Sequence, residues 1–304
     1  MDVRHLELLR ELSVRGTLAA VAAATHRTPS ALSQQLRTAQ REFGVTLVEQ
    51  DGRGLRLTSY GQLLADAADE VARVHEEVQA RLDAARGEPR GLVRIGTFPS
   101  AGEALLPSLV TALAATAIEV EIDDFDLAEA DYATRTLDAD IVIAHSLTGD
   151  IPASADGLTA RVLVREPIDV VLPSAHPLAA HADLRPRDLR GTAWIGVPPG
   201  YPFDTILQRV EAVNDEPLTR VQRLRDNRLT RALVAEGVGL ALLPRFTTVG
   251  DEGVVLRPLV GVPARRSVIA LARPDRFARL AVRRVVDELA TIGESLAATH
   301  GGLP

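Results

Sequence analysis

Polar residues recur at helical spacing between positions 30 and 41. They lie three, four, seven and eleven positions apart and are Ser30, Ser33, Gln34, Arg37 and Arg41. Glutamine and arginine form paired hydrogen bonds with base edges in the major groove, and serine binds phosphate. Thr28-Pro29 is typical of an N-cap followed by a first helical residue. We therefore predict a helix that contacts double-stranded DNA through Thr28, Pro29, Ser30, Ser33, Gln34 and Arg37; the alternative is an ordinary solvated face.

A second candidate contact follows this helix. The segment Asp51-Gly52-Arg53-Gly54 is a turn signal between the apolar run 45–48 and Leu55-Arg56-Leu57-Thr58. A small hairpin with Arg53 at its tip is predicted. Arginine is attracted into narrow minor grooves, so Arg53 is expected beside the base contacts of the preceding helix.

These groups need a compact set of helices to position them. Leu6, Leu8, Leu9 and Leu12 share one face at helical spacing, and Gly16-Thr17 reads as a helix stop followed by a new N-cap. An alanine-rich helix to about residue 24 and the helix from Pro29 to before Gly44 complete a set of three. Three short helices followed by a hairpin are the plan of a winged helix-turn-helix.

A long helix with one apolar seam is predicted from about Ser59 to Arg86. The seam follows heptad spacing through Leu64, Ala67, Val71, Val74 and Val78. Packing against its own domain is the alternative, but no neighbouring helix in the sequence offers a matching face. The seam predicts a homodimer, whose two reading helices would suit an inverted-repeat operator.

The chain beyond residue 91 alternates strand-like and helical runs. The strands are expected at 92–97, 118–122, 141–144, 169–172, 193–197, 239–243 and 267–271. Such alternation indicates an α/β fold with parallel sheets covered by helices.

Composition narrows the function classes further. The 304 residues include no cysteine, which excludes disulfides, thiolate metal sites, cysteine nucleophiles and thiol redox sensing. No apolar run reaches the roughly 18 residues of a membrane span, and no signal-peptide pattern is present, so a cytoplasmic protein without membrane contact is expected. Neither a phosphate-binding loop nor a nucleophile elbow nor a zinc-protease motif occurs. We expect no catalytic residues, no metal and no cofactor.

The chain resembles the LysR-type transcriptional regulators over nearly its whole length. The residues that carry this resemblance are, toward the N-terminus, Val21-Ala22, the run 28–36, the run 43–47, Leu57-Thr58 and Gly61, and, toward the C-terminus, Leu105-Leu106-Pro107, the run 137–141, His176-Pro177-Leu178, the run 234–239 and Leu243-Pro244. The resemblance implies an α/β protein with an N-terminal winged helix-turn-helix at 1–58, a linker and dimerisation helix at 59–88 and a periplasmic-binding-protein-like (type 2) effector domain at 91–304. Subdomain I would be 91–163 with 268–304, and subdomain II 164–267. The implied partners are operator DNA, a small-molecule effector of unknown identity, further copies of the chain up to a tetramer, and RNA polymerase.

Six positions depart from the family pattern. They are Val21, Thr25, Ala39, Gln40, Val48 and Gln50, which stand for alanine, leucine, leucine, glutamate, phenylalanine and arginine. These changes predict a looser winged-helix core. The loss of an arginine at position 50 predicts weaker DNA binding with a shallower salt dependence.

The effector is expected in a cleft at the carboxyl ends of the strands, where helix N-termini supply free amides. The expected contacts are Thr97, Ser100, Ala101, Phe125, His145, Gly200, Tyr201 and Phe203. Ser100 could equally be only an N-cap, and His145 a surface histidine. Asp123, Asp124 and Asp126 around Phe125 would favour a cationic ligand if they faced the cleft, although acidic turns after strands are usually just solvated.

Two competing functions remain at this point. The first is an enzyme, because clefts in α/β sheets also hold active sites, but the sequence lacks the common catalytic motifs. A binding module whose winged helix no longer reads DNA is the second, supported by the departures at 25, 39, 48 and 50. We expect a regulator in which the effector closes the cleft and changes the spacing of the DNA-reading heads.

Overall fold

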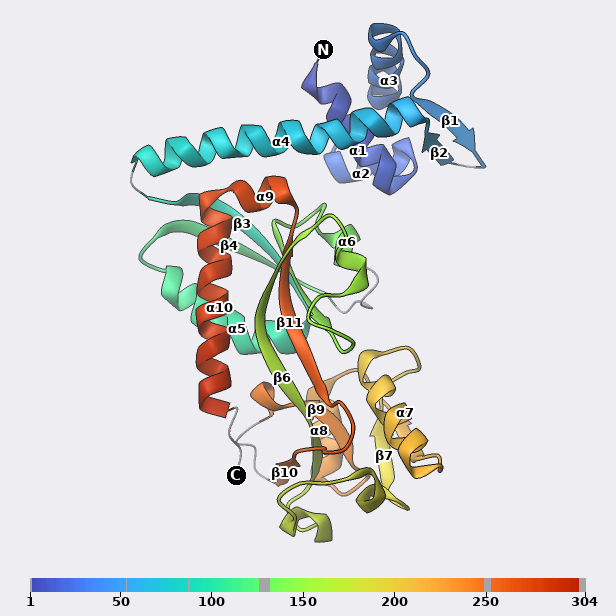
Figure 1. Cartoon of the computed structure of the whole chain (residues 1–304), viewed down its shortest axis with the longest axis vertical. Coiled ribbons are helices and arrows are strands. Elements are labelled where there is room, and N and C mark those ends of the chain that lie inside the picture. Colours follow the sequence, from blue (N-terminus) through green and yellow to red (C-terminus); the bar gives the residue numbers. More distant parts are fainter. Residues whose placement is uncertain (1, 53, 87, 126–131, 249–252, 301–304) are drawn as a thin grey trace. The chain divides into compact units, whose positions relative to one another are not determined.

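The computed structural model describes residues 2–52, 54–86, 88–125, 132–248 and 253–300 (Figure 1). The chain forms two compact units. The first unit comprises Met1–Pro89 with Arg273–Arg283, and the second comprises Arg90–Ala272 with Arg284–Pro304. None of the helices in the described ranges has the length and hydropathy that a bilayer-spanning segment needs.

The first unit begins with three helices, a hairpin and a long helix. The elements are α1 (Val3–Arg15), α2 (Leu18–Thr25), α3 (Pro29–Phe43), β1 (Val48–Asp51), β2 (Gly54–Leu57) and α4 (Ser59–Arg86). The side chains of Thr17 and Thr28 cap α2 and α3 by accepting hydrogen bonds from backbone amides, and Gly16 and Gly44 end α1 and α3 in the left-handed conformation. The sequence prediction of a winged helix-turn-helix is confirmed.

An apolar core joins these elements. Leu9, Leu32 and Leu47 are almost fully buried in it, and Ala65 of α4 joins the same cluster. A Cβ atom at Gly61, in the first turn of α4, would overlap the carbonyl oxygen of Leu47. Glycine at position 61 therefore lets the start of α4 approach the chain just before the hairpin.

The second unit is built on a seven-stranded mixed sheet. Its strands are β3 (Arg90–Thr97), β4 (Ala117–Asp124), β5 (Ile141–Ser146), β6 (Thr159–Pro173), β9 (Ala241–Pro244), β10 (Val254–Arg257) and β11 (Arg265–Ala272). The order is β10-β6-β11-β5-β3-β4, with β9 also paired to β6. Strand β3 pairs in parallel with β4 and β5, whereas β11 is antiparallel to β5 and β6. A separate parallel pair joins β7 (Ala193–Gly196) to β8 (Thr219–Arg223).

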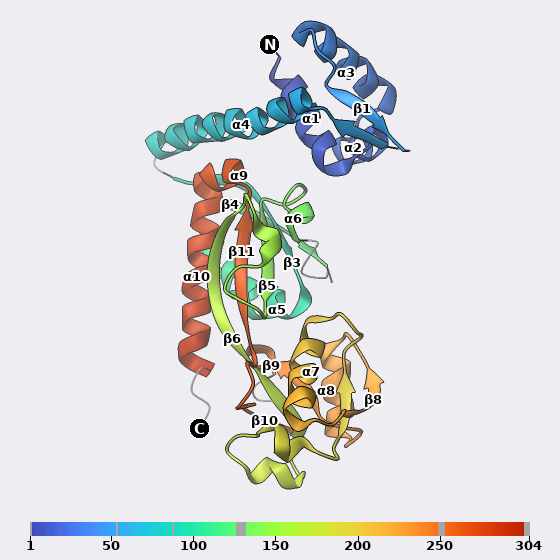
Figure 2. The ribbon, with the colours of Figure 1, turned by 45° about the vertical axis from the view of Figure 1, so that its right-hand side comes forward.

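Helices complete two subdomains along this sheet. They are α5 (Pro99–Leu113), α6 (Tyr132–Arg135), α7 (Pro202–Asn214), α8 (Asn227–Ala235) and most of α10 (Leu280–His300), with short 3-10 turns at Ala153–Ala155, Pro177–Ala180, Pro186–Leu189 and Arg245–Thr247. Helix α9 (Pro274–Ala278) belongs to the first unit. Strands β6 and β11 run as a long pair from the region that contains β5 to the region that contains β9 (Figure 2). The two-subdomain α/β effector fold is confirmed.

The expected parallel pairing holds for β3 with β4 and β5 and for β7 with β8, but not for the whole sheet. The two long strands are antiparallel to each other, and β9 and β10 are antiparallel to β6. Their antiparallel direction follows from the topology, because β6 leaves the first subdomain and β11 returns to it.

Candidate nucleic-acid interface and effector cavity

Helix α3 carries the predicted DNA-reading face. Leu32, Leu36 and Ala39 turn into the core, whereas Pro29, Ser30, Gln34 and Arg37 are exposed on the other side and Ser33 is half-buried. The hydroxyl of Thr28 accepts a hydrogen bond from the amide of Ala31 at 3.3 Å and lies 3.2 Å from the hydroxyl of Ser30. The start of the helix is therefore fixed by the same residues that were predicted to meet DNA.

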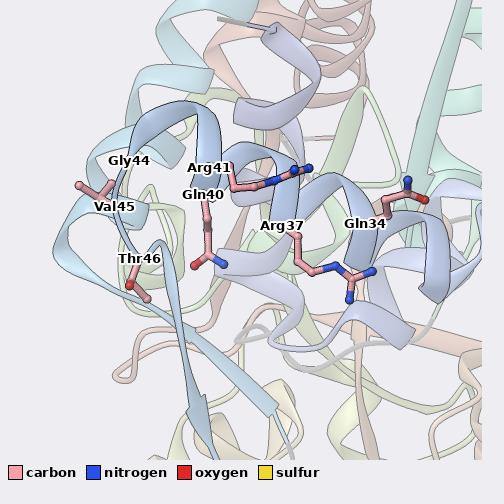
Figure 3. Close-up of a pocket in the computed structure, with 7 residues that line it drawn as sticks. All are labelled: Gln34, Arg37, Gln40, Arg41, Gly44, Val45 and Thr46. Atoms are coloured by element: carbon pink, nitrogen blue, oxygen red, sulfur yellow. The ribbon is translucent and has the colours of Figure 1, made fainter.

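A shallow hollow of about 810 Å³ lies along the second half of this face. Gln34, Arg37, Gln40, Arg41 and the run 44–46 line it (Figure 3). Arg37 and Gln40 project from the same side of α3 in this view. The side-chain oxygen of Gln40 accepts a hydrogen bond from the amide of Leu47 at 2.9 Å, so the glutamine that replaces the family's glutamate still anchors α3 to the hairpin.

The hairpin pairs β1 with β2 from Val48↔Leu57 to Asp51↔Gly54, as the turn signal predicted. Arg53 lies outside the described residues. Gln50 donates a hydrogen bond to the carbonyl of Gly52 at 3.2 Å and so supports the turn. Val21 and Ala39, two of the unusual core residues, are only 1% and 0% exposed, which leaves no sign of a looser core around them.

The predicted seam on α4 divides into a covered and an exposed stretch. Leu64 packs against the winged-helix core and Ala67 and Val71 are half-buried, whereas Val74 and Val78 are about half exposed, at 51% and 49%. Leu82 lies a further helical turn along the exposed stretch and is 46% exposed. Packing within the domain therefore accounts for Leu64 and partly for Ala67 and Val71, whereas Val74, Val78 and Leu82 stay about half exposed among the described residues.

A cavity of about 960 Å³ lies within the second unit, between the subdomains. The N-terminal residues of α5, α7 and α8 border it, and each of these helices follows the carboxyl end of a parallel strand. Of the predicted effector contacts, Thr97, Ser100, His145, Tyr201 and Phe203 line the cavity. The structure therefore brings together five residues that lie as far as 106 positions apart in the sequence.

Three predicted contacts do not line this cavity. Ala101 is 2% exposed because it lies on the core face of α5. Phe125 belongs to the core of the first subdomain, where its ring approaches Gly96 so closely that a Cβ there would lie 2.7 Å from it. Gly200 instead supplies the left-handed turn, with φ +82°, that leads into α7.

His145 lies deep in the wall of the cavity. Its ring makes edge contacts with Phe98 and Tyr132, with centroids 5.1 and 5.8 Å apart, and the side chain is 6% exposed. Burial, together with the positive charge of Arg266, lowers the pKa of His145 from 6.5 to about 3. The imidazole is therefore neutral at physiological pH.

Arg266 is the central residue of the cavity that the sequence did not reveal. Its guanidinium donates to the Glu166 carboxylate, with Nε 2.8 Å from Oε2, and to the hydroxyl of Ser100 at 3.0 Å. The other Glu166 oxygen accepts a hydrogen bond from the amide of Phe246 at 2.8 Å. The guanidinium also lies 5.0 Å from the centre of the Phe98 ring. The buried pair of Glu166 and Arg266 therefore joins β6 to β11, and its further hydrogen bonds reach Ser100 in the first subdomain and Phe246 in the second.

The rim of the cavity carries charges of both signs. Arg228 faces Glu103 at 3.5 Å, and Arg225 lies over the ring of Tyr201 at 4.7 Å. Asp124 is an exposed lining residue, whereas Asp123 is paired with Arg135 at 3.5 Å. Asp126 lies outside the described residues. Because the rim charges are mixed, they give no preference for a cationic ligand.

Comparison with known families assigns both ends of the chain. The family described as "Bacterial regulatory helix-turn-helix protein, lysR family" matches residues 3–62, and "LysR substrate binding domain" matches residues 86–292. The transcriptional dual regulator GltC of Bacillus subtilis is 27% identical over 253 residues, covering 81% of this chain and 82% of its own. CbbR of Xanthobacter flavus is 26% identical over 300 residues, covering 96% and 88%.

Solved structures share the fold over the full length. OxyR from Pseudomonas aeruginosa superposes with a TM-score of 0.67 at 22% identity, covering 100% of this chain and 99% of its own. CbnR in complex with its target DNA superposes with a TM-score of 0.53 at 16% identity, covering 96% and 100%. With both of its domains matched in order, this chain belongs to the LysR family of bacterial transcriptional regulators.

Proposed function

We propose that this regulator reads an operator through the exposed face of α3. The observation that carries the proposal is the exposure of Pro29, Ser30, Gln34 and Arg37 on a helix whose opposite face is locked into the winged-helix core. Gln34 would read adenine, Arg37 guanine or phosphate, and the residues at the start of the helix would bind phosphate. Arg53 at the hairpin tip would enter the adjacent minor groove.

The operator is an inverted repeat bound by a dimer. The exposed stretch of the α4 seam, with Val74 and Val78, is the proposed contact between two copies, and Leu64, Ala67 and Val71 extend the apolar strip toward the DNA-binding domain. The proposed limits are 1–58 for the DNA-binding domain, 59–88 for the linker helix and 91–304 for the effector domain. The proposal also includes a tetramer of two dimers and contact with RNA polymerase.

The cavity between the subdomains takes a small-molecule effector. Five of the predicted contacts line it and come from both subdomains, so a ligand there favours the closed arrangement only if it binds that arrangement more tightly. The signal is not read by thiol oxidation, because this chain contains no cysteine. The role is regulatory rather than enzymatic, and a DNA-bound regulator acts in the cytoplasm.

Selection of bound sequences from a pool of random DNA duplexes tests the proposal. The full-length protein should enrich an inverted repeat whose half-sites are centred about one or more helical turns apart, each turn about 10 base pairs. Arg37→Ala should weaken binding and change the preferred base at one position of each half-site. The matched control is Arg161→Ala, which removes one exposed positive charge from the effector domain and should leave the enriched sequence unchanged.

A protein that enriches no sequence at all would favour the second candidate, a module that has lost DNA reading. The observation behind that candidate is the set of family departures in the winged helix. Of the four departures that support it, at 25, 39, 48 and 50, each side chain nevertheless has a structural place: Thr25 donates to the carbonyl of Val21 at 2.7 Å, Ala39 is buried, Val48 packs against the winged-helix core and Gln50 donates to the carbonyl of Gly52.

A further inference from the structure

The floor of the effector cavity is aromatic and nearly free of uncompensated charge. Phe98 and Phe203 approach it from different subdomains, and Arg266 lies 5.0 and 6.0 Å from the centres of their rings. The charge of Arg266 is already balanced by Glu166, which is itself 1% exposed. A second charge brought to this floor would lack a partner and would lose its hydration.

His145 is the polar group of this floor whose bonding is incomplete. Within the described ranges of the chain, its Nδ1 atom is buried and has no hydrogen-bond partner. The side chain is 6% exposed and lines the cavity. Leaving such a group unsatisfied is costly, and a site built around one rejects ligands that cannot bond to it.

The chemistry of the imidazole limits the complementary group. Burial lowers the pKa of His145 to about 3, so the ring is neutral and one nitrogen donates while the other accepts. A hydroxyl both donates and accepts and therefore suits either tautomer. An ammonium would face the positive Arg266, and a carboxylate would need compensation that Arg266 already gives to Glu166.

We propose that the effector is a hydroxylated aromatic molecule whose ring packs against Phe98 and Phe203 and whose hydroxyl hydrogen-bonds to the imidazole of His145. The proposal rests on the proposed effector role of the cavity and adds the chemical class of the ligand. Aromatic rings favour edge and offset contacts with the aromatic floor, and the cavity of about 960 Å³ leaves room for a second substituent toward the rim.

Calorimetric titration of the full-length protein with matched pairs tests this class. The pairs are 4-hydroxybenzoate with benzoate and 4-methylphenol with toluene, so that one pair is anionic and the other neutral. In at least one pair the hydroxylated member should bind about tenfold more tightly or better. Equal affinities within both pairs, or no binding of any of the four at millimolar concentration, would overturn the proposal.

Two variants locate the hydroxyl. His145→Phe keeps a ring but removes the hydrogen bond, so the difference within the pair should fall to less than twofold. His181→Gln, at an exposed histidine outside the cavity, should leave the difference unchanged. Tyr132→Phe should also preserve it. A difference that survives His145→Phe but disappears in Tyr132→Phe would assign the hydroxyl to the tyrosine and refute the role of His145.

A measurement on the unaltered protein covers the case in which His145→Phe fails to fold. In protein labelled with ¹⁵N at its seven histidines, 4-hydroxybenzoate or 4-methylphenol should shift the ring nitrogens of His145, and benzoate or toluene should not. Binding of a hydroxylated probe with unchanged His145 signals would contradict the proposal. Operator binding is measured separately. If the protein fails to bind an operator but still prefers the hydroxylated ligands, the regulatory role is refuted and the ligand class stands. If it binds an operator but shows no preference for the hydroxylated ligands, the ligand class is refuted and the regulatory role stands.

Discussion

Breaking the buried pair between Glu166 and Arg266 should destabilise the effector domain strongly. Glu166→Gln removes the negative charge that balances a guanidinium only 3% exposed, and it places an amide where two donors converge, Arg266 Nε and the amide of Phe246, both at 2.8 Å. Each hydrogen bond to a charged group contributes about 1.5–3 kcal/mol, and breaking a buried pair costs about 3–5 kcal/mol. We expect the free energy of unfolding to fall by about 3–5 kcal/mol.

Urea denaturation followed by Trp194 fluorescence measures this loss. Trp194 is the sole tryptophan and is fully buried in the core of the second subdomain, so its emission should report unfolding of the effector domain. The control is Asp150→Asn, which breaks the exposed pair with Arg165, next to Glu166 on β6, and should cost far less.

The double variant Glu166→Leu/Arg266→Met separates charge from packing. Replacing both partners with apolar side chains leaves no buried charge, so most of the lost stability should return. Equal losses for Glu166→Gln and Asp150→Asn would refute the reasoning, because burial would then have no influence on the energy of these pairs.

Three further perturbations test other features of the account. His145 has a pKa of about 3 in the folded chain against 6.5 for the ordinary group. Between these values the unfolded state binds more protons, so the free energy of unfolding decreases as the pH is lowered. At about 1.4 kcal/mol per pH unit, the free energy of unfolding from urea denaturation should fall by about 2 kcal/mol between pH 6.5 and pH 5. This loss should be absent in His145→Phe. Gly61→Ala should destabilise the winged-helix unit by about 1–3 kcal/mol, because the new methyl group overlaps the chain before β1. The control is Gly149→Ala, where a Cβ meets no atom closer than 3.8 Å and thermal melting followed by circular dichroism should be unchanged. Similar melting of both variants would contradict the close approach at Gly61. Replacing Val74 and Val78 with glutamate should give monomers in sedimentation velocity and weaken operator binding, and intact dimers would show that these residues are not the interface.

The elements of the fold that could be predicted are those with local signals. Thr28-Pro29 begins α3 and Gly44 ends it, because N-caps and left-handed glycines act within one helical turn. Strands buried on both faces, such as β5, give continuous apolar runs that stand out in a sequence.

Other elements carry their signal in distant partners. The strand β8 reads Thr-Arg-Val-Gln-Arg and is mostly exposed, so its sequence has little apolar content to reveal it. Glu166 lies at the middle of β6 and is buried although it is charged, because its partner Arg266 lies 100 residues later in the sequence. The same distance explains why Arg266 was missed as a member of the site.

The effector cavity shows the limit of reasoning from strand ends. Thr97, Ser100 and His145 were found because the carboxyl ends of β3 and β5 meet at one edge. Phe125 was assigned there on the same argument, but Gly96 opens a space beneath it and the ring packs into the core. Side-chain direction after a strand depends on such neighbours and not on position alone.

The central claim is specific DNA reading, and fluorescence anisotropy tests it most directly. The full-length protein should be titrated against labelled DNA from upstream of its own gene and against a scrambled duplex, at two salt concentrations. The account predicts tight binding to the native sequence alone, with an affinity that falls as salt rises. Equal, weak binding to both duplexes at both salt concentrations would contradict it.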